Sequence, residues 1–254
     1  MSVTARAFAG AVALAVIAGV ASPSVRAQTK QEFNWCIGEG NPTPAQKITG
    51  CTAVIEAGKL KGKRLSFTFS NRGVAYYERG EYDRAIQDFG HAIELNPKYA
   101  LAFNNRCAAY HDKGEYDRAI LDCSEAIKLN PKYADAFFNR GLSFQGKSQY
   151  DRAIQDYNQA IKFDPKYADA LFNRGNSYQV KGQYDRAIQN YDQAIKLNPN
   201  HASAYYNRSL AKKQKGDGAG AEADLAAARK INPNTGQETD PCRASRFRRN
   251  LLKQ

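Results

Sequence analysis

Residues 82–97 read YDRAIQDFGHAIELNP, and this stretch decides the fold because it returns three times. The copies are YDRAILDCSEAIKLNP at 116–131, YDRAIQDYNQAIKFDP at 150–165 and YDRAIQNYDQAIKLNP at 184–199. A degenerate copy, GAEADLAAARKINP, covers residues 220–233. The closing prolines are 34 residues apart, and a fixed period of this length indicates stacked units that each hold a few helices or strands.

The spacing of residues within one period indicates two helices. When each repeat is numbered 1 to 34 from Ser66, positions 4, 8 and 11 share one helical face, and positions 20, 24 and 27 share another. Small residues at 8, 20 and 27 let the two helices approach, and large residues at 4, 11 and 24 fill the space between them. Glycine at position 15 marks the turn in four repeats, with Ser148 there in the third. Proline at position 32 closes each unit because it cannot continue a helix.

This pattern resembles the tetratricopeptide repeat, a helix–turn–helix unit of 34 residues, over 170 of the 254 residues. The family's alanine at position 20 is Ala85, Ala119, Ala153, Ala187 and Ala221. Its small residue at position 8 is Gly73, Cys107, Gly141, Gly175 and Ser209. The resemblance implies an all-α fold, a right-handed solenoid of helical hairpins with a concave side that binds proteins or peptides.

The register divides the chain into an array with two flanking segments. Five repeats are expected at 66–99, 100–133, 134–167, 168–201 and 202–235. The last has Lys212 at position 11 where the other four have an aromatic residue, which is typical of a terminal capping unit. Residues 28–65 are expected to form a degenerate N-terminal hairpin, because PAQKITGCTAVIEAG at 44–58 aligns with the second helix of the repeat. Residues 236–254 form a basic tail, which we expect to be flexible.

The N-terminus has the features of a cleaved signal peptide, residues 1–27. Arg6 is followed by an apolar run from Ala7 to Val20, and the segment ends in a small-residue cleavage pattern at Ala27. The apolar run is shorter than the roughly 20 residues of a spanning helix, so we expect no membrane span in the mature chain. We therefore expect a periplasmic or secreted protein.

Four of the five cysteines suggest two disulfides, each within one hairpin. Cys107 and Cys123 occupy positions 8 and 24 of the second repeat, which should meet between its two helices. Cys36 and Cys51 have nearly the same separation in the N-terminal hairpin. An exported protein permits both bonds. The alternative is that these residues are buried free thiols, which act as small hydrophobic side chains.

The concave side is the candidate binding site, and the family resemblance places it on the first helix of each repeat. The expected lining is rich in amides and aromatic rings, which suit an extended peptide backbone and its side chains. The candidate residues are Asn71, Tyr77, Asn104, Asn105, His111, Phe138, Asn139, Gln145, Phe172, Asn173, Gln179, Tyr206 and Asn207. The alternative for Phe138, Phe172 and Tyr206 is packing against neighbouring helices. The carboxylate clamp of some relatives uses lysines at positions 2 and 5, which this chain lacks, so an anionic C-terminus is not the expected ligand.

A second regular feature is the arginine at position 7 of every repeat. We expect each arginine to pair with the acidic residue at position 23 of the second helix. The arginines are Arg72, Arg106, Arg140, Arg174 and Arg208, and the residues at position 23 are Asp88, Asp122, Asp156, Asn190 and Asp224.

Residues 141–148 read GLSFQGKS and match the G-x-x-x-x-G-K-[ST] pattern of a phosphate-binding loop. That loop needs a preceding strand and opens a helix, whereas the repeat register places Gly141 in the middle of a helix. The three histidines have no metal-ligand spacing, so we expect no metal and no cofactor.

The charge distribution argues against a nucleic-acid partner. The net charge is +12, but residues 66–235 hold 24 Lys/Arg against 20 Asp/Glu with alternating signs, which is typical of solvated helix surfaces. The sequence therefore favours a non-catalytic scaffold in the cell envelope that binds a protein or an extended peptide. A self-assembling structural module is the alternative, and a nucleotide-binding or enzymatic protein is a third hypothesis.

Overall fold

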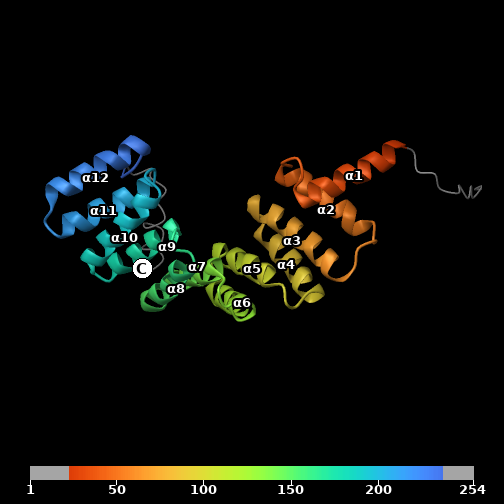
Figure 1. Ribbon diagram of the computed structural model, residues 1–254, viewed down its shortest axis with the longest axis horizontal. Coiled ribbons are helices and arrows are strands. Elements are labelled where there is room, and N and C mark those ends of the chain that lie inside the picture. The colour runs from red at the N-terminus through yellow and green to blue at the C-terminus, as the bar shows by residue number, and fades with distance from the viewer. Residues whose placement is uncertain (1–22, 237–254) are drawn as a thin grey trace, which may run out of the picture.

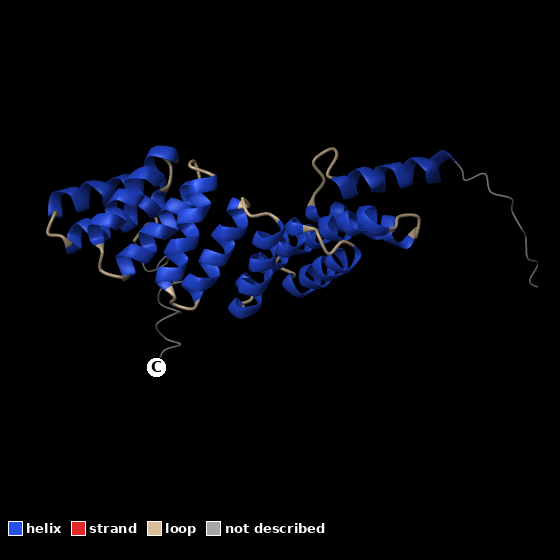
Figure 2. Ribbon diagram, turned by 60° about the horizontal axis from the view of Figure 1, so that its bottom comes forward, coloured by secondary structure: helices blue, strands red, loops and turns tan. Residues whose placement is uncertain are grey.

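A computed structural model describes residues 23–236, and all its regular structure is helical (Figure 2). The described helices are α1 (Pro23–Ile37), α2 (Pro44–Glu56), α3 (Gly62–Glu78), α4 (Tyr82–Leu95), α5 (Ala100–Asp112), α6 (Tyr116–Leu129), α7 (Ala134–Gly146), α8 (Tyr150–Phe163), α9 (Ala168–Val180), α10 (Tyr184–Leu197), α11 (Ala202–Gln214) and α12 (Gly218–Ile231). Each repeat is a helix pair from α3–α4 to α11–α12, which confirms the predicted all-α hairpin solenoid.

The turn between the two helices of a repeat depends on a backbone with positive φ. Gly80, Gly114, Gly182 and Gly216 adopt φ between 72° and 85° at position 15. Ser148 adopts φ 60° at the same position of the third repeat. A left-handed residue is the usual end of a helix, and glycine enters that region without a steric penalty from Cβ.

In repeats 1, 3 and 4 the two helices of the hairpin meet in a contact between positions 8 and 24. The glycine at position 8 lies directly under an aromatic ring from the second helix. A Cβ atom added at Gly141 would lie 2.7 Å from a ring carbon of Tyr157, and Gly73 has the same relation to Phe89. Phe89 and Tyr157 are almost completely buried. A large residue can therefore fill position 24 only because position 8 has no side chain.

The hairpins stack in order into an arc (Figure 1). First helices of consecutive repeats approach each other closely, as α5 and α7 do, whereas no pair of consecutive second helices packs as closely among the described residues. Stacked units curve toward the side where they are closest. The first helices α5 and α7 accordingly lie toward the inside of the arc, and α6 and α8 lie outside (Figure 1).

The N-terminal segment folds as a sixth hairpin, α1–α2, packed on α3. α1 begins at Pro23 and passes through the expected cleavage position at Ala27, and α3 begins at Gly62, four residues before the first repeat. The α3 extension follows Lys61, whose extended backbone (φ −140°, ψ 162°) makes it the N-cap.

Two predicted segments lie outside the described part of the chain. These are the apolar run of the expected signal peptide, within residues 1–22, and residues 237–254 of the expected tail. Within residues 23–236, no helix combines the length and the apolar character that crossing a membrane requires.

Candidate functional site

The residues expected to bind a ligand all lie on the first helices of the repeats, α3, α5, α7, α9 and α11, and among them Asn104 is buried. We use "inner face" for positions 2, 5, 6, 9 and 12 of the first helices α3, α5, α7, α9 and α11. Polar side chains connect these helices to each other. The Asn139 amide donates to Asn104 across α7 and α5 at 3.0 Å, and the Tyr77 hydroxyl donates to Asp112 of α5 at 2.5 Å. Side-chain hydrogen bonds therefore join α3 to α5 and α5 to α7.

The asparagines at position 6 have two kinds of environment. Some bond to the adjacent hairpin, and others remain half-buried on the inner face. Asn71 donates to the carbonyl of Cys36 at 3.0 Å, and Asn207 donates to Asn176 at 2.7 Å, so both join adjacent hairpins. Asn173 donates to the carbonyl of Asp169 in its own helix and is half-buried. Asn105 is also half-buried. The regular asparagine row thus supplies inter-repeat hydrogen bonds at some repeats and half-exposed amides at others.

The position 12 side chains are anchored by neighbouring residues. Gln145 accepts a hydrogen bond from the buried hydroxyl of Tyr157 at 2.7 Å, and Gln179 accepts one from Tyr191 at the same distance. His111 lies 3.3 Å from the Ser143 hydroxyl of the next repeat. These contacts hold the side chains in fixed positions at the surface, which lowers the entropy that a ligand would lose by ordering them.

The inner-face aromatic rings of repeats 3 and 4 pack on one side and stay half-exposed on the other. The Phe138 ring centroid lies 4.8 Å from that of Tyr167, and the Phe172 centroid lies 4.5 Å from that of His201. Phe138 and Phe172 thus each pack against the ring at position 34 of their own repeat, as the alternative of packing against neighbours implies. Tyr206 has Gly236 as its neighbour, where the described chain ends.

Sequence reasoning missed the aromatic residue at position 34, which covers position 5 of its own repeat. Tyr99 is hydrogen-bonded to Ser70, and Tyr133 is hydrogen-bonded to Asn104. Burial, aided by the nearby Asp135 carboxylate, raises the pKa of Tyr133 to about 12. The signal was present in the sequence as the recurring tetrapeptide PKYA.

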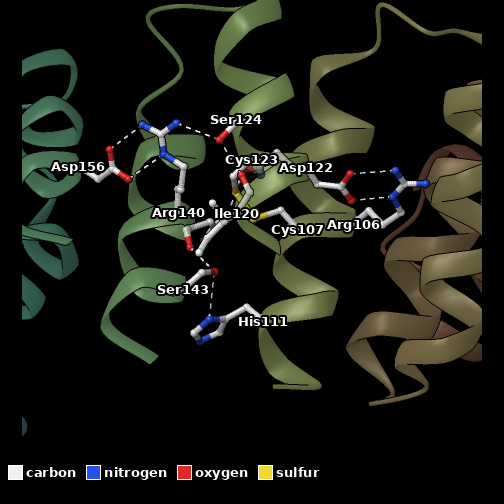
Figure 3. The surroundings of a disulfide bond; sticks show 12 residues. Arg106, Cys107, His111, Ile120, Asp122, Cys123, Ser124, Arg140, Ser143 and Asp156 are labelled. Atoms are coloured by element: carbon white, nitrogen blue, oxygen red, sulfur yellow. Dashed lines mark hydrogen bonds and ion pairs between the residues drawn. A yellow bond between two sulfur atoms is a disulfide. The ribbon is translucent and has the colours of Figure 1, made fainter. Parts of the chain in front are cut away.

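Four of the five arginines at position 7 form the expected pair with a carboxylate of the second helix, and Arg174 bonds to the Asn190 amide instead. Arg140 donates Nε and Nη2 to the two oxygens of Asp156 at 2.8 Å, and its Nη1 donates to Ser124 of the preceding repeat at 3.0 Å (Figure 3). Bidentate arginine–carboxylate bonds are strong and geometrically specific. The residues contacted in the preceding hairpin are Thr52, Ser124, Asn158 and Asp192. Each such arginine therefore joins two hairpins, which is a structural role.

Two disulfides each lie within one hairpin. Cys107 is bonded to Cys123 with the Cα atoms 5.5 Å apart (Figure 3), and Cys36 is bonded to Cys51 with the Cα atoms 4.6 Å apart. The first bond takes the place of the glycine–aromatic contact at positions 8 and 24.

The residues that match a phosphate-binding loop have packing roles. Gly141 and Gly146 both lie within α7, so their backbone N–H groups are inside a helix and not at the N-terminus of one. A Cβ at Gly146 would lie 2.6 Å from the Tyr116 ring. Lys147 is paired with Asp117 of the preceding repeat. The structure thus gives this stretch neither the strand nor the helix start that a phosphate-binding loop requires.

A metal centre and a cavity are two other kinds of candidate site. No group of three or more metal-ligating side chains occurs in the described part of the chain. A cavity of about 670 Å³ opens between α2 and α4, and its polar floor is the Arg72–Asp88 pair. These two charges satisfy each other, and the lining also includes the carboxylates of Glu32 and Glu56.

Comparisons with known proteins agree with the fold. A family model described as a TPR repeat matches residues 73–114, 108–148 and 146–180, and one described as a tetratricopeptide repeat matches 168–201. No curated protein sequence matches the chain.

Several solved structures are similar. A crystal structure of MamA has 24% identity and a TM-score of 0.58, covering 65% of this chain and 96% of its own. YrrB, described as a TPR protein with an unusual peptide-binding site, has 23% identity and a TM-score of 0.57, with coverage of 73% and 93%. TTC0263, a TPR protein of Thermus thermophilus, has 21% identity and a TM-score of 0.57, with coverage of 74% and 99%. The repeat register, the hairpin stack and the matching family models together show that this chain belongs to the tetratricopeptide repeat family.

Proposed function

We propose that this protein is a non-catalytic scaffold that binds an extended peptide or protein segment along its inner face. The observation that carries the proposal is the recurrence of a half-exposed ring beside a half-exposed amide in repeats 3 and 4, at Phe138 with Asn139 and at Phe172 with Asn173. Packed helices are about 10 Å apart, and an extended chain advances about 3.3 Å per residue, so every third residue of a ligand meets an equivalent position. YrrB supports the proposal as a protein of the same fold with a described peptide-binding site.

The test is affinity capture from an envelope extract with wild type and two inner-face variants. The first variant replaces Phe138, Asn139, Phe172 and Asn173 by alanine. The second, Asn105→Arg/Asn173→Arg, keeps the packed rings and adds bulk to the face. We expect both variants to lose the partners that wild type recovers, whereas an outer-face control, Leu121→Ala/Gln155→Ala, keeps them. Circular dichroism verifies folding of each variant. Identical partners for all four proteins would show that the inner face is not the binding site.

We propose further that the protein is exported and processed after Ala27. The sequence of residues 1–27 and the two disulfides support an oxidising compartment. Cleavage there leaves the chain from Gln28 onward, which retains most of α1. Fractionation followed by N-terminal sequencing tests this. Recovery of the protein in the cytoplasm with an intact N-terminus would overturn it.

Self-assembly is a second candidate function, favoured by apolar side chains at the two ends of the stack. Phe33 and Ile37 of α1 are 44% and 53% exposed, and Ile231 of α12 is 37% exposed. Stacking of α12 on α1 of another copy would cover both groups. Light scattering over a range of concentrations decides between the candidates, because a constant particle mass excludes assembly.

A further inference from the structure

The residues at position 2 of the inner face are apolar in the first two repeats and acidic in the next two. Phe67 of α3 and Leu101 of α5 are 44% and 43% exposed, so this end of the face is apolar. The equivalent residues of α7 and α9 are Asp135 and Asp169, both exposed. Position 2 of α11 is Ser203, so a ligand that crosses the whole face meets two apolar side chains in repeats 1 and 2, two carboxylates in repeats 3 and 4, and a serine in repeat 5.

The two carboxylates have no strong cationic partner in the described part of the chain. Neither Asp135 nor Asp169 forms an ion pair with a lysine or an arginine there. Asp135 is hydrogen-bonded to the Tyr167 hydroxyl, which is a neutral donor. Asp169 lies 3.8 Å from His201, and burial lowers the pKa of this histidine below its ordinary value, which favours the neutral ring at neutral pH. The two carboxylates thus lack a lysine or arginine partner, and each lies in the first turn of its helix, where the helix dipole favours a negative charge.

The described chain ends beside α11, which is the first helix next to α9 and its Asp169. A Cβ at Gly236 would lie 3.2 Å from the Tyr206 ring, and Tyr206 is the inner-face residue at position 5 of α11. Residues 237–254, which we call the C-terminal segment, follow directly. Fully extended, 18 residues span up to about 60 Å. With about 10 Å from one first helix to the next, α3 lies about 40 Å from α11, within reach.

The C-terminal segment has basic residues followed by a leucine, an order that is complementary to the carboxylates and apolar side chains of the inner face taken from repeat 4 back to repeat 2. Arg243, Arg246, Arg249 and Leu252 recur at every third residue. In the polyproline II conformation, which has three residues per turn, every third side chain faces the same side and lies about 9 Å further along, close to the distance from one repeat to the next. When Arg246 lies opposite Asp169, the same register brings Arg249 opposite Asp135 and Leu252 opposite Leu101.

We propose that the C-terminal segment binds along the inner face of its own molecule, running from repeat 5 back toward repeat 2, and competes there with external ligands. This inference rests on the proposed function, because the same face is the site. Exposed ion pairs are individually weak. A tether supplies an effective concentration in the millimolar range, so weak contacts are sufficient in cis. Salt screens such contacts and therefore releases the segment.

The test measures access to the face with a fluorescent synthetic peptide of residues 243–254, by anisotropy at low salt. All proteins are full chains. Arg246→Glu/Arg249→Glu removes the competing segment from the face, so the peptide should bind this variant at least about tenfold more tightly than wild type. The matched control Arg248→Glu/Lys253→Glu makes the same change in net charge out of register. We expect its affinity for the peptide to stay close to that of wild type.

A charge swap tests the assigned partners. The Asp135→Lys/Asp169→Lys variant should not bind the peptide. It should instead bind a peptide that has Glu at positions 246 and 249. Equal affinity of the peptide for wild type and for Arg246→Glu/Arg249→Glu would show that the segment does not occupy the face. Absence of binding to every variant would overturn the inference, as would concentration-dependent dimers that place the segment on a second copy. Capture of partners that Asn105→Arg/Asn173→Arg abolishes tests the proposed function separately.

Discussion

At the scale of single residues, the contact between positions 8 and 24 makes glycine necessary in the middle of a helix. Gly141→Ala places a Cβ 2.7 Å from the ring of Tyr157, which is completely buried and cannot move away. Overpacking of this kind costs about 1–3 kcal/mol. We expect the free energy of unfolding, measured by urea denaturation, to fall by that amount.

Gly90→Ala is the matched control for this prediction. Gly90 also lies inside a helix, but the nearest atom to an added Cβ is Nη1 of Arg106 at 3.7 Å, an ordinary contact. Alanine is the better helix former, so this variant should gain about 0.5–1 kcal/mol. If both substitutions change stability equally, helix propensity and not the ring contact determines the result.

The fourth repeat departs from the arginine–aspartate pairs, and this departure can be reversed. Arg174 donates Nε to the neutral amide of Asn190 at 2.7 Å, and burial lowers the pKa of this arginine. Asn190→Asp restores the carboxylate that repeats 1, 2, 3 and 5 have. A hydrogen bond to a charged group contributes about 1.5 kcal/mol or more, so we expect stabilisation of that order. In an Arg174→Gln background the same change should destabilise the protein, because it buries an unpaired carboxylate.

At the scale of elements, the hairpins were predictable because the same pattern of residues recurs in all five repeats, and this recurrence outweighs the local differences between them. The sequence could not show where α1 and α3 begin, since their first residues, Pro23 and Gly62, precede the first of the 34-residue repeats. It also did not show which inner-face residues are engaged. Asn71 and Asn173 occupy the same position, yet one bonds to the preceding hairpin and the other to its own helix. Such differences depend on the neighbouring hairpin and not on the repeat itself.

The disulfide of the second hairpin gives a prediction at this scale. Cys107→Ala/Cys123→Ala should lose about 3 kcal/mol, the stabilisation expected from closing a loop of this length. Cys107→Gly/Cys123→Tyr copies the pair of the third repeat and fills the same space. It should lose the constraint of the bond but less of the packing, so its unfolding free energy should lie between those of the alanine variant and wild type. Peptide mapping without reduction comes first, and recovery of all four cysteines as free thiols would contradict both disulfides.

At the scale of the whole molecule, a stack in which each hairpin contacts only its neighbours should not unfold as one unit. Within residues 23–236, interior hairpins are packed on both sides, whereas α11–α12 is packed on one. The second helix α8 also buries Ile154 and Tyr157, whereas the buried residues of α12 are Ala221, Asp224 and Ala228. Hydrogen exchange measures local opening directly. We expect the backbone amides of α12 to exchange faster than those of α8.

The other end of the stack separates the effect of position from that of covalent constraint. The α1–α2 hairpin is also terminal, but the Cys36–Cys51 bond connects its two helices. We therefore expect its amides to exchange more slowly than those of α12, and Cys36→Ala/Cys51→Ala should abolish that difference while α8 stays unchanged. The slow exchange of α8 should persist because its neighbours on both sides remain. A single exchange rate for all helices would contradict nearest-neighbour stability and would show that inter-repeat bonds, such as that of Arg140 to Ser124, couple the whole array.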